Sequence, residues 1–135
     1  MPRTIAIGDV HGCADEFEEL LAKLELKPDD RVIQVGDLVN RGPDSHRVIE
    51  LAREYQVESI IGNHELRLIT AREKTKPSLP NQYDQVTLEE LTKDDWNYLE
   101  AMPKFLYDAQ IDTVIVHGGF LPNKPWQTQG SELIT

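Results

Sequence analysis

Four short stretches of the sequence bring together residues that can bind metal ions or phosphate. Each combines glycine with carboxylate, amide or imidazole side chains: Gly8-Asp9-Val10-His11-Gly12, Gly36-Asp37-Leu38-Val39-Asn40-Arg41-Gly42, Gly62-Asn63-His64-Glu65 and His117-Gly118-Gly119. Three of the chain's 4 histidines lie in these stretches. Hard oxygen donors combined with neutral imidazole suit Mn, Fe, Zn or similar divalent ions, and the set contains no thiolate. The residue types therefore predict a metal centre.

The same set of residues predicts hydrolysis of a phosphoester. A carboxylate between two cations about 4 Å apart would relieve their repulsion, and water held there would readily give hydroxide. Arg41 lies shortly after Asp37, and its planar guanidinium can hold two phosphate oxygens at once. Taken singly, a Gly-Asp pair after a strand is more often a turn, and a lone histidine is usually structural. Four such stretches in one chain favour the chemical interpretation.

The segments between these stretches indicate how they are brought together. Short apolar runs that end at glycine predict strands at 4–7, 31–35 and 57–61. Helical spacing predicts helices from Asp15 to Leu24, after Pro43-Asp44 and from Glu65 to Arg72. This alternation is typical of an α/β fold with a mainly parallel sheet, in which the carboxyl ends of the strands share one edge. We therefore expect the four stretches to lie along one rim.

The second half of the chain is predicted to be less regular. Residues 74–86 contain two prolines and predict a surface loop, after which Thr87 begins a capping-box pattern that predicts a short helix. A further helix is expected from Lys93 to Met102, where Pro103 stops it. Two more strands are predicted at 105–107 and 113–116, the latter leading into His117.

Several single residues receive a structural rather than a functional interpretation. Asp15 and Glu18 resemble a capping box at the start of the first helix. His46 lies at a helix start with no motif around it, and we expect it on the surface. Arg67 and Arg72 could reach an anionic substrate, but on an exposed helix we expect them to be solvated.

Length and charge narrow the class of protein. The chain has 135 residues, which fits one domain. Lys plus Arg number 14 against 24 Asp plus Glu, and the resulting net charge of −10 argues against binding to duplex nucleic acid or an anionic membrane surface. The sequence has no apolar run of about 18 residues, no signal-peptide pattern and only 1 cysteine, Cys13. We expect a soluble, cytoplasmic domain.

The four stretches resemble the signature blocks of calcineurin-like metallophosphoesterases. Their order and wording are closest to the phosphoprotein phosphatase branch, which also holds bacterial diadenosine tetraphosphatases. The resemblance runs from residue 8 to about residue 122, nearly the whole chain. It implies an α/β fold of the metallophosphoesterase type, a layered sheet with flanking helices, over a single domain at 1–135.

The resemblance also implies which residues hold two divalent metal ions. One ion would be bound by Asp9, His11 and Asp37. The second ion would share Asp37 and add Asn63 and His117. A hydroxide bridging the two ions would then attack phosphorus in line, without a phosphoenzyme intermediate.

Three further residues receive catalytic roles from the resemblance. Arg41 would grip the phosphate, and His64 would protonate the leaving oxygen as general acid. Many members of the family place Asp before this arginine and pair it with the histidine, whereas here the residue is Asn40. An amide can orient His64 but cannot stabilise its protonated form, so we expect a lowered pKa for His64. We interpret this departure as a hint about the substrate.

A second departure concerns the end of the chain. The family supplies one further metal-binding histidine, and usually another phosphate-binding arginine, after the last block. No histidine follows His117 here. We therefore expect the chain to be the amino-terminal portion of a longer protein, with part of the second sheet missing. The alternative is that water or another subunit completes the second metal site. Completion by another subunit would make the protein a homo-oligomer.

The hypothesis from the sequence is a dinuclear metal-dependent phosphoester hydrolase that acts on a phosphoprotein or a dinucleoside polyphosphate. The alternative is a catalytically inactive scaffold or regulatory module that keeps the fold, which the absent histidine would explain. A receiver-like domain that takes phosphate onto Asp ranks lower, because that chemistry has no use for Arg41 or the histidines.

Overall fold

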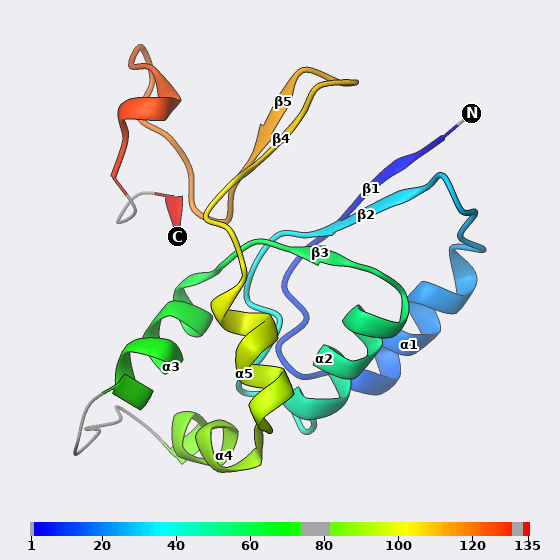
Figure 1. Ribbon diagram of the computed structural model, residues 1–135, viewed down its shortest axis with the longest axis vertical. Coiled ribbons are helices and arrows are strands. Elements are labelled where there is room, and N and C mark those ends of the chain that lie inside the picture. The colour runs from blue at the N-terminus through cyan, green and yellow to red at the C-terminus, as the bar shows by residue number, and fades with distance from the viewer. Residues whose placement is uncertain (1, 74–81, 131–133) are drawn as a thin grey trace.

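A three-stranded parallel sheet lies at the centre of the first half of the chain (Figure 1). The computed structural model describes residues 2–73, 82–130 and 134–135. Its parallel strands, in the order β1-β2-β3, are β1 (Thr4–Ile7), β2 (Arg31–Gln34) and β3 (Glu58–Ser59). Ile5 pairs with Val32, and Ile33 pairs with Glu58. The predicted parallel sheet is confirmed for these strands, although the third is only two residues long.

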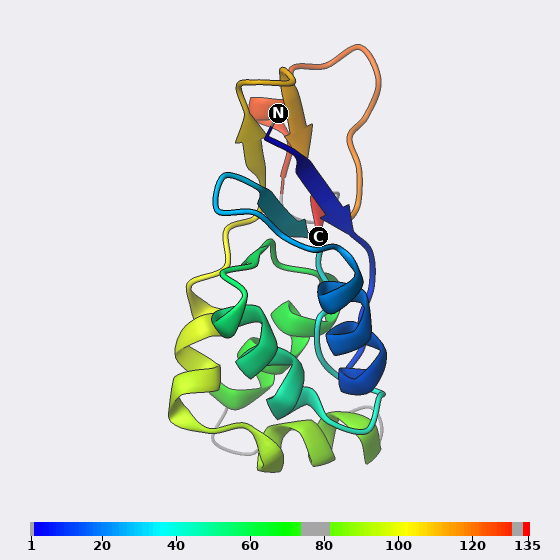
Figure 2. The same cartoon turned by 90° about the vertical axis from the view of Figure 1, so that its right-hand side faces the viewer.

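Helices gather on one side of this sheet, as Figures 1 and 2 show. The described residues form α1 (Ala14–Lys23), α2 (Ser45–Glu54), α3 (Asn63–Glu73), α4 (Gln82–Glu90) and α5 (Lys93–Glu100). Helix α2 is central, because it contacts α1, α4 and α5. None of the helices in the described part of the chain is long and apolar enough to cross a membrane.

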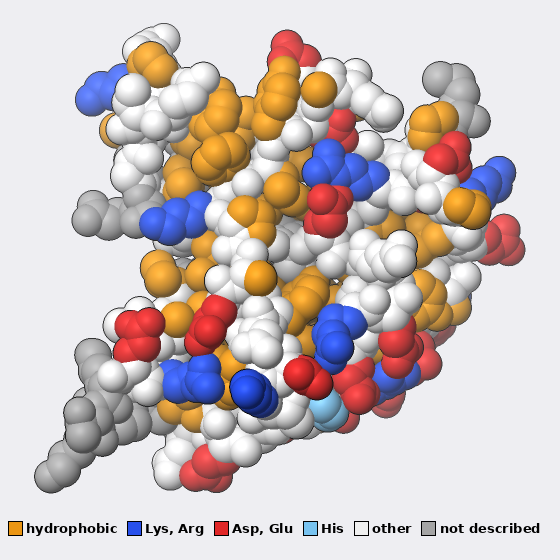
Figure 3. Space-filling view, in the orientation of Figure 1, with side chains coloured by type: hydrophobic (Ala, Val, Ile, Leu, Met, Phe, Trp, Pro, Cys, Tyr) orange, Lys and Arg blue, Asp and Glu red, His pale blue; other side chains and the backbone are white. Residues whose placement is uncertain are grey.

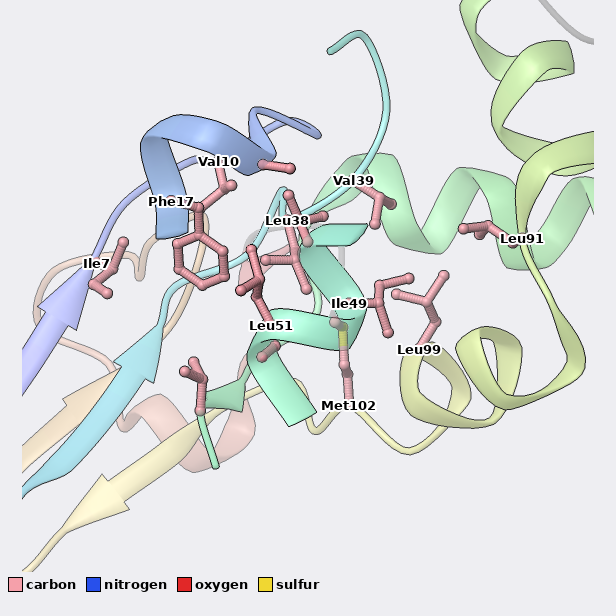
Figure 4. Close-up of a cluster of buried hydrophobic side chains, with 14 of the residues drawn as sticks. Ile7, Val10, Phe17, Leu38, Val39, Ile49, Leu51, Leu91, Leu99 and Met102 are labelled. Carbon is pink, nitrogen blue, oxygen red and sulfur yellow. The ribbon is translucent and has the colours of Figure 1, made fainter. Parts of the chain in front are cut away.

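The core lies between the sheet and the helices, and α2 supplies much of it (Figure 4). Val48, Ile49, Leu51 and Ala52 are fully buried, so this face of α2 is covered by its neighbours. Phe17 from α1 belongs to the same cluster, together with Leu38, Val39, Leu99 and Met102. The loop that carries Asp37 is therefore anchored in the core by Leu38 and Val39, which directly follow Asp37.

Helix α1 begins differently from the prediction. Its N-cap is Cys13, which makes no side-chain capping bond, so the capping box expected at Asp15 and Glu18 is wrong. The chain already turns before that point, because Cys13 N–H donates to the Val10 carbonyl at 3.1 Å. Asp15 instead lies in the first turn, where its charge interacts favourably with the helix dipole.

Helix α4 begins earlier than predicted, at Gln82, so residues 82–86 are not a loop. Residues 74–81 of the expected loop lie outside the described residues. Thr87 does not cap a helix, because it lies inside α4 and is buried. The capping box is found at α5 instead, where Thr92 and Asp95 bond each other's backbone N–H groups.

The last two strands form a separate hairpin. β4 (Leu106–Asp108) and β5 (Thr113–Ile115) pair antiparallel with each other, and in the described part of the chain they do not join the parallel sheet. The hairpin projects away from the helices (Figure 2). Apolar side chains gather over it on the face shown in Figure 3, and Phe105, Tyr107 and Ile111 are exposed. A 3-10 helix at Trp126–Thr128 follows, and its Trp126 ring lies 4.9 Å from that of Phe105.

The sequence context predicted a surface position for His46, but its side chain is only partly exposed and contacts neighbouring helices. Its side chain is 36% exposed, and Nδ1 lies 2.6 Å from Oδ2 of the buried Asp95 on α5. Its backbone N–H donates to Glu90 at 3.0 Å, and Nε2 lies 3.4 Å from Glu50. His46 therefore links α2 to both α4 and α5. The hydrogen bond to Asp95 is the main cause that raises the pKa of His46.

The raised pKa predicts the direction in which stability depends on pH. The folded state binds the proton of His46 more tightly than the unfolded state, so the stabilisation is complete below the unfolded pKa of about 6.5 and is lost as the pH rises through the folded-state pKa. We expect His46→Gln to cost about 1 kcal/mol or less at pH 5.5, because the side chain is partly exposed, and still less at pH 8.5.

Urea unfolding of the metal-free wild type and variant at both pH values measures this difference. If His46→Gln lowered the free energy of unfolding more at pH 8.5 than at pH 5.5, the raised pKa of His46 would be contradicted.

Candidate metal centre

The centre is built on turns that follow the strands. After β1 and β2 the backbone takes positive φ at His11 (48°), Asp37 (56°), Asn40 (77°) and Arg41 (76°). Such conformations cost about 1–3 kcal/mol each in non-glycine residues and need support from their surroundings. The two turns support each other, because the N–H groups of Val10 and His11 both donate to the Asp37 carbonyl at 3.1 and 3.0 Å.

Two glycines leave room for this close packing. A Cβ atom at Gly62 would collide with the backbone and carboxylate of Asp37. Gly36 has a φ of 96°, and a Cβ there would lie 2.7 Å from Nδ1 of His117. These positions therefore favour glycine because Asp37 and His117 occupy the space of a side chain.

Glu65, at the start of α3, fixes the Asp37 turn from behind. Its buried carboxylate accepts hydrogen bonds from the N–H groups of Asp37 at 2.7 Å and Gly62 at 3.0 Å, and more weakly from Val39 at 3.4 Å. Burial raises the pKa of Glu65 to about 7, and the nearby Asp37 charge contributes to this increase. Sequence reasoning gave Glu65 no role, although it is the last residue of the third stretch.

The Asp37 carboxylate lies in the middle of the predicted ligands. Its Oδ2 is 3.6 Å from His11 Nε2 and 3.3 Å from His117 Nε2. Asp9 Oδ2 lies 3.6 Å from the same His11 nitrogen. The Asp37 side chain is only 6% exposed, whereas that of Asp9 is 51% exposed. The group is thus buried on the Asp37 side and open on the Asp9 side.

Asn63 completes the group of predicted metal ligands. One atom of its side-chain amide lies 3.1 and 3.2 Å from the two Asp37 oxygens and 3.0 Å from His117 Nε2. Without a cation, the amide satisfies these acceptors by turning its nitrogen toward them. With the oxygen turned inward, as a metal ligand requires, acceptors would face acceptors, and a cation would remove that conflict.

The imidazoles of His11 and His117 have the tautomer that metal binding needs. His117 Nδ1 lies 2.8 Å from the Val35 carbonyl, and His11 Nδ1 lies 3.3 Å from the Val39 carbonyl. A carbonyl can only accept, so in the neutral rings Nδ1 carries the hydrogen and Nε2 presents a lone pair toward Asp37. Side-chain ligand atoms of Asp9, Asp37 and His117 all lie within 4.8 Å of one another. The donor set therefore fits divalent cations.

His64 lies beside this group, with its ring centre 4.7 Å from that of His11. It also has a nitrogen within 4.8 Å of the ligand atoms of His11 and Asp37. Its backbone N–H donates to Asp37 Oδ1 at 3.0 Å. Burial is the main cause that lowers the pKa of His64, Asp37 opposes it, and the charges of Arg67, His11 and Arg41 lower it further. The direction agrees with the expectation from the sequence.

Sequence reasoning named Asn40 as a neighbour of His64 but missed the residues of α3 and α4 that surround the pair. Asn40 lies 3.1 Å from His64 Nδ1 and is itself bonded to Asp84 and Thr87 of α4. We expected Arg67 to be solvated, but it forms an ion pair with the buried Asp84 at 2.8 Å. Asp84 and Thr87 are three residues apart and so share a helix face. That spacing would have been the signal, had α4 been predicted to begin before Asp84.

Arg41 and Arg72 lie in different places. Arg41 is exposed and lines a cavity of about 310 Å³ together with Gly42, Tyr83 and Val86. Arg72 lies over the Trp96 ring at 4.6 Å and pairs with Glu100 at 2.7 Å, both on α5. Arg72 therefore lies on the surface, as expected, but its guanidinium contacts two side chains of α5. Arg41 has an open space beside it that can admit a ligand.

Known proteins resemble this chain in sequence. Symmetrical bis(5'-nucleosyl)-tetraphosphatases of Serratia proteamaculans and Salmonella paratyphi C are 34% and 35% identical to it, over 96% and 93% of the chain. The alignments cover 47% and 46% of those proteins. The chain thus spans about half the length of the curated relatives it matches.

Solved structures resemble it as well. The crystal structure of a candidate diadenosine tetraphosphatase matches with a TM-score of 0.85 and 29% identity, covering 98% of this chain and 57% of that one. A metallophosphoesterase from Sphaerobacter thermophilus matches with a TM-score of 0.68 and 29% identity, covering 85% of this chain and 46% of that one. The family model of calcineurin-like phosphoesterases matches residues 2–133, and the chain belongs to this family.

Proposed function

We propose that this chain is a dinuclear metal-dependent phosphoesterase that hydrolyses a dinucleoside polyphosphate. The observation that carries the proposal is the buried Asp37 carboxylate, around which Asp9, His11, Asn63 and His117 converge. The choice of substrate rests on the relatives named as symmetrical bis(5'-nucleosyl)-tetraphosphatases. We place the protein in the cytoplasm, in keeping with its acidic composition and single cysteine.

The proposed ligand sets share Asp37. Asp9 and His11 would complete one site, and Asn63 and His117 the other, with manganese, iron or zinc as the metal. Two divalent ions would supply Lewis acidity toward phosphate oxygens and lower the pKa of water. The tautomers of His11 and His117, each with a backbone carbonyl at Nδ1, support their role as ligands.

The other residues of the centre would bind and orient the substrate. Arg41 would hold phosphate oxygens through its planar guanidinium. His64 would donate a hydrogen bond to the leaving oxygen, and Asn40 would hold the ring in place. Because the chain carries a net charge of −10, it does not attract an anionic substrate over long distances. Substrate capture would therefore depend on the metal ions and Arg41.

Replacement of the shared ligand tests the metal sites. We expect Asp37→Asn to weaken binding of Mn²⁺ by more than about 100-fold, because loss of a direct ligand should exceed the effect of losing a residue that only supports one. Isothermal titration calorimetry measures the affinity and the number of ions bound. Asp15→Asn makes the same change of charge at an exposed position of α1 and should bind Mn²⁺ like the wild type. Equal affinities for all three proteins would exclude the proposed centre.

Replacement of His64 tests the catalytic role separately from metal binding. We expect His64→Ala to lower the turnover of diadenosine tetraphosphate by about 100-fold or more, the typical cost of losing one hydrogen-bond donor aimed at developing charge. Affinity for Mn²⁺ should stay within a few-fold of the wild-type value. If the wild type turns over no faster than His64→Ala, the chain is an inactive scaffold rather than an enzyme.

A further inference from the structure

A buried carboxylate contacts the side chain of Asn40. Many family members have an acid in place of this asparagine. Asp84 of α4 is fully buried. Its Oδ1 accepts a hydrogen bond from Asn40 Nδ2 at 2.6 Å and another from Arg67 at 2.8 Å. The negative charge that many family members place next to this histidine is thus present here, but the Asn40 side chain lies between it and His64.

Asp84 determines which way the Asn40 amide points. A carboxylate can only accept, so the amide nitrogen must face Asp84 and the amide oxygen must face away from it. The hydroxyl of Thr87 lies 2.9 Å from that oxygen and can donate to it. Asn40 and Thr87 are also buried. The reversed amide would set two acceptors against each other, which is costly away from water.

The orientation of Asn40 in turn determines the tautomer of His64. The second amide hydrogen of Asn40 is directed to His64 Nδ1 at 3.1 Å, and an Arg67 nitrogen lies 3.3 Å from the same atom. Both groups can only donate, so Nδ1 accepts and Nε2 carries the hydrogen. This is the reverse of His11 and His117, whose Nδ1 atoms face backbone carbonyls.

We propose that Asp84 is a positioning residue that acts through Asn40 to keep His64 as an Nε2–H hydrogen-bond donor, and that this arrangement selects phosphoanhydride substrates over alkyl phosphate esters. The second half of this proposal rests on the proposed function. It chooses between the two substrate classes that the sequence left open, because a phosphoprotein carries an alkyl ester.

The selectivity follows from what leaves. In hydrolysis, an oxygen from water bonds to phosphorus, the bond from phosphorus to the leaving oxygen breaks, and the leaving oxygen keeps the bonding electron pair. The proton released by water goes to solvent. A phosphate leaving group is stable as an anion, since its second pKa is about 6, so a hydrogen bond from Nε2–H suffices and His64 keeps its proton. A serine or threonine oxygen would leave as a strongly basic alkoxide, which requires a proton from a general acid.

The tautomer can be measured without activity. Long-range ¹H–¹⁵N NMR of ¹⁵N-histidine-labelled, metal-free protein distinguishes the two tautomers, and His64→Gln assigns the signal. We expect Nε2–H for His64 and Nδ1–H for His11 and His117. Asp84→Asn should preserve Nε2–H, because its amide oxygen can still accept from Asn40. Asp84→Ala should weaken the preference, and Asn40→Asp should reverse it. Nδ1–H at His64 in the wild type would overturn the positioning role, as would an unchanged tautomer in Asn40→Asp.

The selectivity is tested with Mn²⁺ by comparing kcat/KM for diadenosine tetraphosphate and for a phosphoserine peptide. The double variant Asn40→Asp with Asp84→Asn moves the carboxylate next to His64 and keeps the total charge. We expect it to narrow the preference for the anhydride by at least about tenfold, through faster cleavage of the peptide. A changed tautomer with an unchanged preference would overturn the selectivity. If no variant hydrolyses either substrate, the proposed function fails, whereas the NMR result still decides the role of Asp84.

Discussion

The buried Asp37 carboxylate is the group on which the rest of the centre depends. Its Oδ1 accepts the His64 backbone N–H at 3.0 Å, and its Oδ2 faces the Nε2 atoms of His11 and His117 at 3.6 and 3.3 Å. Among the described residues, no lysine or arginine forms an ion pair with it. A buried charge needs compensation, and imidazole nitrogens that present lone pairs to it would not provide it. Divalent cations would, which is why the arrangement favours a metal centre over a structural one.

The backbone around Asp37 supports this geometry at a conformational cost. Positive φ angles at Asp37, Asn40 and Arg41 are stabilised by bonds from neighbouring turns and by the buried carboxylate of Glu65. The same turns are packed on Leu38 and Val39, which belong to the hydrophobic core. The fold itself therefore holds Asp37, the residue that the proposed metal sites share, as a preorganised site would require.

The sequence predicted the parts of the centre that depend on local pattern. Strand, glycine and polar residue follow each other within a few positions, so the rim of the parallel sheet could be anticipated. The structure brings Asp9, His11, Asp37, Asn63 and His117 together, and their roles as ligands stay predictions. Contrary to expectation, His117 is not positioned by a strand of the parallel sheet. It follows β5 of the antiparallel hairpin, and its Nδ1 bonds the Val35 carbonyl.

Contacts between distant segments could not be predicted in this way. Asp84 reaches Asn40, and Asp95 reaches His46, across more than forty residues of sequence. The prediction that Thr87 begins a helix was wrong for a related reason. The same pattern of residues that opens a helix can also lie on the buried face within one. Burial and the partner chosen by packing decided these cases, and neither can be read from neighbouring residues.

Anomalous X-ray scattering from crystals grown with Mn²⁺ would test the central claim most directly. The account predicts two peaks about 4 Å apart on either side of the Asp37 carboxylate, one near Asp9 and His11 and the other near Asn63 and His117. Peaks elsewhere on the molecule, or none within reach of Asp37, would contradict it.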